Sequence, residues 1–243
     1  MGVSVGQFLL IGLILFAAGV VQGAVGFGSG LIAVGLISAL IGVRPASIAF
    51  CLPAIALCAM MLWRLRGHLR FHRVAPVVIG LLVGVPVGVW FLAHADHRAL
   101  EIALGALMAL SVLYNLVPRW SRRRWHPVFV GIPCGLLSGM LSGAFSTGGP
   151  PLVAYLSTQQ FDRLRFAASL QMLFLINTSV RAAELVRRGL FTTQTLWLGL
   201  AGVVAVPLGA TLGLRLLKKI PDRQFRWVVL ALLALLAVRY LLP

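Results

Sequence analysis

The chain has 243 residues, of which 60% are hydrophobic and 11% charged, and its mean hydropathy is +1.00. Soluble domains are about 45–50% apolar, so this composition excludes an ordinary water-soluble protein. A net charge of +16 is typical of nucleic-acid binders, but here the basic residues lie between long apolar segments. That distribution favours a membrane protein and argues against a nucleic-acid partner.

Ten apolar segments follow one another along the chain. Most approach the roughly 20 residues that cross about 30 Å of hydrocarbon as a helix. In lipid the backbone must satisfy its own hydrogen bonds, so we expect helices. The first is interpreted as a retained helix, because no Lys or Arg precedes it. The second and seventh are short and fit either half-helices, re-entrant pieces or full spans. The segments are 8–25, 29–42, 46–63, 74–94, 99–117, 127–143, 148–160, 164–187, 193–216 and 222–242.

Lys and Arg gather in alternate loops. If the loop that holds Arg64, Arg66, Arg70 and Arg73 is cytoplasmic, strict alternation places 15 of the 21 basic residues on that side and both termini outside. This bias follows the positive-inside rule. The pattern predicts a multi-pass protein of a cell inner membrane, with the lipid bilayer as its surroundings.

The chain also contains an internal repeat of about 120 residues. Gly84–Gly88 (GVPVG) recurs as Ala205–Gly209 (AVPLG), and Arg44–Ala46 aligns with Arg165–Ala167 at the same offset. Each copy holds five segments, and an odd number inserts the second copy upside down. Two inverted copies are typical of secondary transporters, whose substrate site lies at the midplane between them. We therefore predict an all-α integral membrane protein with one transmembrane domain made of two inverted-topology repeats, residues 1–120 and 121–243.

Each repeat contains a glycine-rich segment between apolar blocks. The first break is Gln22–Gly30 and the second break is Ser138–Pro151. Glycine allows unusual backbone angles, and the Pro150-Pro151 pair suits the first turn of a new helix. A helix that starts inside a membrane presents N–H groups and partial positive charge, which suit an anion. The two breaks are therefore expected to converge on one midplane site.

Two other polar residues belong to this prediction. Gln22 is the first residue of the first break, with Ser138 as its counterpart in the second, and Asn177 lies near the centre of its segment. Asn177 fits a cavity or an interhelical hydrogen bond equally well. The glycines also fit plain close packing of helices, but two matched breaks favour the site. The predicted substrate-binding residues are Gln22, Gly26, Gly28, Ser29, Gly30, Ser146, Thr147, Gly148, Gly149, Pro150 and Asn177.

The titratable residues indicate no catalytic or metal centre. The five acids all lie near segment ends, so none is placed as a proton-coupling carboxylate. Glu184 has Arg181, Arg187 and Arg188 nearby on one helix, which predicts a surface ion pair. No cofactor or metal is expected. An intramembrane enzyme would need converging acid, base or metal groups within the spans, and the sequence presents none.

The two glycine motifs carry a family resemblance. Gly26-Phe27-Gly28-Ser29-Gly30 and Ser146-Thr147-Gly148-Gly149-Pro150-Pro151-Leu152, set in two similar halves, resemble the sulfite exporter TauE/SafE-like family over nearly the whole chain. The resemblance implies export of small sulfur-containing anions, including sulfite and organosulfonates. Ser29 stands where the family often has another glycine, and Ser146-Thr147 precede only two glycines. Both departures place extra hydroxyl groups near the expected site.

The expected function is therefore secondary transport that exports small anions. A cell interior negative by 100 mV favours the exit of each negative charge by about 2.3 kcal/mol, which removes the need for proton coupling. Alternating access would rock one repeat against the other around the breaks. An anion channel or an importer of the same fold are alternatives, and a non-transporting membrane protein ranks last. A homo-oligomer is compatible with each of them.

Overall fold

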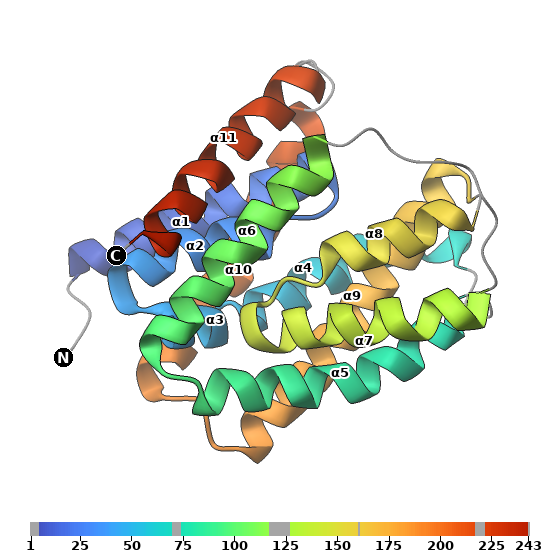
Figure 1. Ribbon diagram of the computed structural model, residues 1–243. Coiled ribbons are helices and arrows are strands. Elements are labelled where there is room, and N and C mark those ends of the chain that lie inside the picture. The colour runs from blue at the N-terminus through green and yellow to red at the C-terminus, as the bar shows by residue number, and fades with distance from the viewer. Residues whose placement is uncertain (1–4, 70–73, 117–126, 160, 217–221, 243) are drawn as a thin grey trace. The chain divides into compact units, whose positions relative to one another are not determined.

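The computed structural model describes residues 5–69, 74–116, 127–159, 161–216 and 222–242, and these form helices with no strand among them (Figure 1). The helices are α1 (Val5–Val25), α2 (Ser29–Ile41), α3 (Val43–Ala49), α4 (Cys51–Leu65), the 3-10 turn η1 (Arg66–His68), α5 (Ala75–His94), α6 (His97–Leu116), α7 (Pro127–Phe145), α8 (Gly149–Thr158), α9 (Arg163–Arg187), α10 (Thr193–Leu216) and α11 (Asp222–Leu241).

Each of the ten predicted segments is helical, so the all-α prediction is confirmed. The third segment differs from the prediction because α3 and α4 meet at Phe50. Pro53 explains the interruption, since it lacks the N–H that would bind the Ala49 carbonyl in a continuous helix. The predicted boundary between the repeats, at residues 120 and 121, lies outside the described residues.

Six helical stretches within the described residues are long and apolar enough to cross a membrane. The outer faces of the helices are strongly apolar: Phe129 is 80% exposed, Leu9 69% and Trp197 63%. Large apolar side chains on the surface suit a lipid environment. The six stretches are Gly6–Ala24, Val43–His68, Ala75–His94, His97–Tyr114, Val128–Phe145 and Thr193–Arg215, and Ser29–Ile41 and Trp227–Leu241 are shorter apolar helices.

The helices form two compact units, and each unit draws on both halves of the chain. Unit 1 contains Met1–Pro53, His94–Pro118 and Phe191–Pro243, and unit 2 contains Ala54–Ala93 and Arg119–Leu190. Helices α1, α2, α3, α6, α10 and α11 therefore belong to unit 1. Helices α5, α7, α8 and α9, with most of α4, belong to unit 2. The compact units thus differ from the sequence halves expected as repeats.

In unit 1, α1 and α10 pack against each other through glycines. A Cβ on Gly209 would collide with the carbonyl oxygen of Phe16, and one on Gly213 with that of Val20. Gly213 lies four residues after Gly209, and its contact Val20 lies four residues after Phe16. The residue numbers rise in the same direction along both helices, so α1 and α10 run parallel. Helix α11 lies beside α6 in the same unit (Figure 1). Close backbone approach of this kind is typical of helix packing in membranes.

In unit 2, α5 and α7 repeat this arrangement. A Cβ on Gly84 would collide with the carbonyl oxygen of Leu136, and one on Gly88 with that of Met140. These two helices also run parallel. In both units a helix with an internal Val-Pro pair packs against a helix that ends at a glycine-rich break. The packing thus fixes where each break begins.

Candidate functional site

The first break joins α1 to α2 within unit 1 and is closed by its own residues. Gln22 Oε1 accepts hydrogen bonds from the Ser29 backbone N–H at 3.2 Å and from the Ser29 hydroxyl at 2.8 Å. Both side chains are buried. Gly26 and Gly28 have φ of 88° and 102°, which L side chains rarely adopt. The amide oxygen of Gln22 thus accepts from the N–H and the hydroxyl of Ser29, the first residue of α2.

The second break joins α7 to α8 within unit 2 and is built differently. Its left-handed residue is Ser146, with φ of 56°. The Ser138 hydroxyl donates to the Gly148 carbonyl at 2.7 Å, and the Thr147 hydroxyl donates to the Phe145 carbonyl at 3.2 Å. Both hydroxyls therefore bind carbonyl oxygens. Neither hydroxyl takes up an N–H group at the start of α8.

The N-terminus of α8 presents the backbone N–H groups of Gly148 and Gly149. Its N-cap residue is Gly148, which has no side chain to accept hydrogen bonds from the first turn. Pro150 and Pro151, the second and third residues of the helix, suit a helix start and have no N–H of their own. The helix dipole adds partial positive charge at this end.

Asn177 of α9 lies against this helix start. Its side chain is 1% exposed. Neither Oδ1 nor Nδ2 has a hydrogen-bond partner among the described residues. A Cβ built on Gly148 would lie 3.1 Å from Asn177 Nδ2, so the amide reaches the N-terminus of α8. A buried amide without partners costs about 1–3 kcal/mol for each unsatisfied group. Its placement at an electropositive helix end makes Asn177 a candidate ligand for an anion.

Arg181 is the residue that sequence reasoning misses. The sequence predicts it at the surface beside Glu184, and that prediction is wrong, because its side chain is completely buried. Glu184 pairs with Arg187 at 2.8 Å and Arg188 at 3.2 Å, as predicted. Arg181 Nε donates to the Gly143 carbonyl at 3.0 Å, in the last turn of α7. The i, i+4 spacing from Asn177 is the available signal, since it puts both residues on one helix face.

The glycines of the two breaks divide between those that allow close helix packing and those that have a left-handed backbone. Gly23 packs against Ala210, Gly139 against Gly84 and Gly143 against Gly88, so these serve close helix approach. Gly26 and Gly28 instead have open space where a side chain would lie and owe their identity to positive φ. Close helix packing therefore accounts for Gly23, Gly139 and Gly143, and backbone conformation accounts for Gly26 and Gly28.

The predicted site residues form two groups. Gln22, Gly26, Gly28, Ser29 and Gly30 lie together at the first break in unit 1. Ser146, Thr147, Gly148, Gly149, Pro150 and Asn177 lie together at the second break in unit 2. Only the second group places a buried side chain with no partner among the described residues, that of Asn177, at a helix N-terminus. The second break is therefore the better candidate site.

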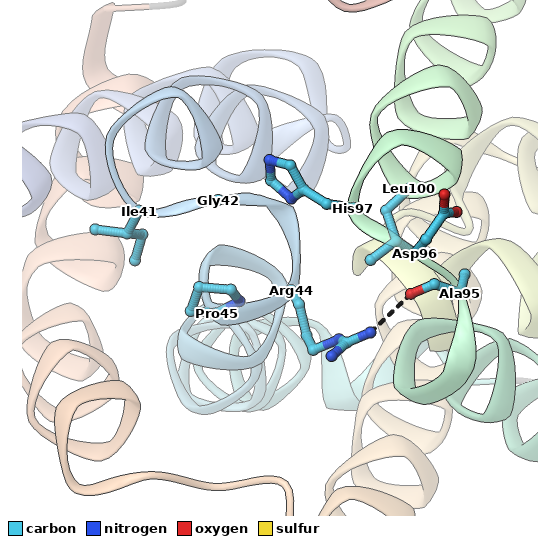
Figure 2. A pocket seen from close by; sticks show the side chains of 8 residues that line it. All are labelled: Ile41, Gly42, Arg44, Pro45, Ala95, Asp96, His97 and Leu100. Carbon is cyan, nitrogen blue, oxygen red and sulfur yellow. Dashed lines mark hydrogen bonds between the residues drawn. The ribbon is translucent and has the colours of Figure 1, made fainter.

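A separate cavity of about 390 Å³ in unit 1 contains none of these residues (Figure 2). Figure 2 shows Arg44 reaching the Ala95 carbonyl, at 2.7 Å, with His97 and Asp96 at the rim. Asp96 Oδ1 accepts the Ala99 N–H at 3.1 Å and so caps α6. The polar groups of this cavity hold the turn between α5 and α6.

The described part of the chain has no cluster of three or more His, Cys, Asp or Glu that could hold a metal ion. The geometry of the second break is that of a helix start beside neutral and positive side chains. It can bind and orient an anion through N–H donors.

Apolar spans, parallel glycine-packed helices and two interrupted helices define a multi-pass helical membrane protein. The family model described as sulfite exporter TauE/SafE matches residues 11–240. The chain therefore belongs to the sulfite exporter TauE/SafE family, a family of membrane transporters, as its two glycine motifs predicted.

Two curated relatives match part of the chain. It is 30% identical over 169 residues to the probable sulfite/organosulfonate exporter TauE of Cupriavidus necator, covering 66% of this chain and 64% of that protein. It is 25% identical over 172 residues to the probable inner membrane transporter protein TsaS of Comamonas testosteroni, covering 68% and 70%. The first match thus spans slightly less than two thirds of the relative. No solved structure matches the chain.

Proposed function

We propose that this protein is a secondary transporter of a cell inner membrane that exports small, sulfur-containing anions such as sulfite or organosulfonates. The observation that carries the proposal is the unpartnered Asn177 amide at the N-terminus of α8, within the described residues. Family membership and the names of the two relatives support the same substrate class.

The chemistry of the second break favours an oxyanion. An anion at this helix start would accept hydrogen bonds from the N–H groups of Gly148 and Gly149 and from Asn177 Nδ2, and the helix dipole would favour its charge. Oxyanions present several acceptor oxygens on one small group, which suits several converging donors. The Asn177 amide would then gain the partner that the described residues do not give it.

The two halves, residues 1–120 and 121–243, are proposed as inverted-topology repeats. The support is the equivalent composition of the two glycine-packed pairs. Helix α1, the first of its half, packs with α10 of the other half, and α7 packs with α5. Each pair joins a helix that ends at a break to a helix with an internal proline, Pro207 or Pro86.

Export needs no proton coupling if the substrate is anionic. An inside-negative potential of 100 mV favours the exit of one negative charge by about 2.3 kcal/mol. An anion channel with the same site would also conduct outward. Saturation and counterflow separate the two, because a carrier exchanges labelled for unlabelled substrate across the membrane and an open channel does not.

The decisive experiment measures efflux from proteoliposomes loaded with sulfite, with sulfate and acetate as controls, under an imposed potential. We expect saturable sulfite loss that accelerates as the interior becomes negative. Absence of flux for sulfite and for an organosulfonate, with correctly inserted protein, would refute the proposed export. Uptake that exceeds efflux at the same gradient would instead favour an importer.

A glycine substitution ties the flux to the second break. In Gly148→Ala the new Cβ collides with Ser138 Oγ and crowds Asn177 Nδ2. We expect at least a tenfold lower efflux rate, equivalent to about 1.4 kcal/mol. Gly12→Ala is the matched control, because a Cβ at Gly12 has no atom within 4 Å. Equal flux in both variants would remove the second break from the transport path.

A further inference from the structure

Two side chains of α9 bracket the second break. Asn177 Nδ2 approaches Gly148, at the start of α8, and Arg181 Nε binds the Gly143 carbonyl, at the end of α7. Asn177 is 1% exposed and Arg181 is 0% exposed. Since they are four residues apart on one helix, their side chains lie on the same face. The break is thus flanked by an amide and by a guanidinium group, both buried.

A fully buried arginine needs an explanation in an apolar protein. Ionisable groups inside a membrane protein are costly and are typical of substrate paths. The two acids of unit 2 that the structure describes pair with other arginines, Glu184 with Arg187 and Arg188, and Asp162 with Arg165. Arg181 Nε donates to the Gly143 carbonyl at the end of α7, which places the Arg181 charge beside the second break.

We propose that Arg181 is the charge-selecting residue of the site, and that Arg181 and Asn177 together recognise a singly charged oxyanion. This inference rests on the proposed function and deepens it. Arg181 contributes one full positive charge. The α8 N-terminus contributes roughly half a positive charge, and the α7 C-terminus, where Arg181 binds the Gly143 carbonyl, contributes roughly half a negative charge, so the total is about one positive charge. A sulfonate or hydrogensulfite ion balances that total, whereas a doubly charged sulfate leaves excess negative charge in the interior.

The test measures binding without transport, by isothermal titration calorimetry on the detergent-purified protein. The probes are methanesulfonate, sulfate and dimethyl sulfone, a neutral molecule of similar shape to methanesulfonate. Wild-type protein is expected to bind methanesulfonate more tightly than either of the others. Arg181→Gln should weaken methanesulfonate binding roughly 10- to 100-fold and change dimethyl sulfone binding less than about twofold. A merely structural role for Arg181 would weaken both probes alike.

Arg188→Gln is the matched control, on the same helix. Arg188 binds Glu184 at 3.2 Å, and its side chain is 23% exposed. Its loss should leave methanesulfonate affinity unchanged. Equal methanesulfonate affinity in Arg181→Gln and wild type, or no binding of methanesulfonate by wild type, would overturn the inference.

A second variant serves if Arg181→Gln does not purify as a single species. Asn177→Asp keeps the size of the side chain and places a carboxylate within one helical turn of Arg181. It should weaken methanesulfonate binding at least tenfold, and unchanged binding would overturn the inference. Binding that depends on Arg181 without any efflux from proteoliposomes would refute export alone. The two proposals can therefore fail separately.

Discussion

The two helix breaks look alike in sequence and differ in how their polar groups are used. At the first break, Gln22 accepts both hydrogen bonds that Ser29 can donate to it, and glycines take the left-handed angles. At the second break, Ser138 binds a carbonyl, a serine takes the left-handed angle, and the Asn177 amide has no partner among the described residues. The buried amide at the first break is thus paired, and the buried amide at the second has no partner among the described residues.

This difference separates a structural role from a binding role. Polar groups buried in a protein are normally paired, and an exception calls for a ligand or another specific cause. The first break resembles a hinge or a fixed turn, in which Gln22 substitutes for a cap. The second resembles a receptor for an acceptor-rich group. Substitutions at equivalent places in the two breaks should therefore affect different properties.

Asn177→Leu should produce the largest effect, on transport alone. Leucine has a similar volume and removes the amide donor, so sulfite efflux should fall roughly 10- to 100-fold. The free energy of unfolding should stay the same or rise, because an unpartnered amide disappears. Efflux and thermal stability, measured on the same preparation, check this prediction. A destabilised protein with normal efflux would reverse the assignment of the two breaks.

Gln22→Leu should show the opposite pattern. The Ser29 N–H and hydroxyl lose their acceptor inside the protein, and stability should fall by about 1–3 kcal/mol. Gln22→Glu is the control, because it keeps an acceptor oxygen and should recover part of the loss. Thermal unfolding in detergent measures both variants. Unchanged stability in Gln22→Leu would mean that the first break has another source of hydrogen bonds.

Much of the fold and part of the site follow from the sequence, and the reasons are local. Apolar length predicts each helical segment, and the Gly26–Gly28 and Pro150-Pro151 motifs predict where helices stop and start. The roles within the breaks do not follow, because they depend on partners distant in sequence. In the sequence, Gln22 and Asn177 look equally suitable as ligands. The structure distinguishes them, because Gln22 Oε1 accepts a hydrogen bond from the Ser29 hydroxyl at 2.8 Å. Sequence reasoning misplaces Arg181 because three arginines surround one glutamate on the same helix, and burial selects among them.

Gly28→Ala should have a moderate effect on stability. The φ of 102° at Gly28 is unfavourable for alanine, which should cost about 1–2 kcal/mol. A collision with more distant parts of the protein is excluded, because a Cβ there has no such atom within 4 Å. Gly12→Ala, in the middle of α1, should instead stabilise by about 0.5–1 kcal/mol. Thermal unfolding of both variants checks that Gly28→Ala lowers stability and that Gly12→Ala raises it. A stabilising Gly28→Ala would show that the first break changes conformation readily.

Ser169→Ala should give the smallest effect and extends the comparison along α9. Ser169 lies two helical turns before Asn177, and its buried hydroxyl has no hydrogen-bond partner among the described residues. If the substrate binds only at the second break, removal of this hydroxyl should raise stability by up to about 1 kcal/mol and leave efflux unchanged. If the substrate path continues along this face of α9, sulfite efflux should fall in Ser169→Ala with no gain in substrate affinity. Ser157→Ala, whose hydroxyl binds the Val153 carbonyl at 2.7 Å, is the control for losing a paired hydroxyl. The two variants, compared by thermal unfolding and by efflux, thus locate where the polar path through unit 2 ends.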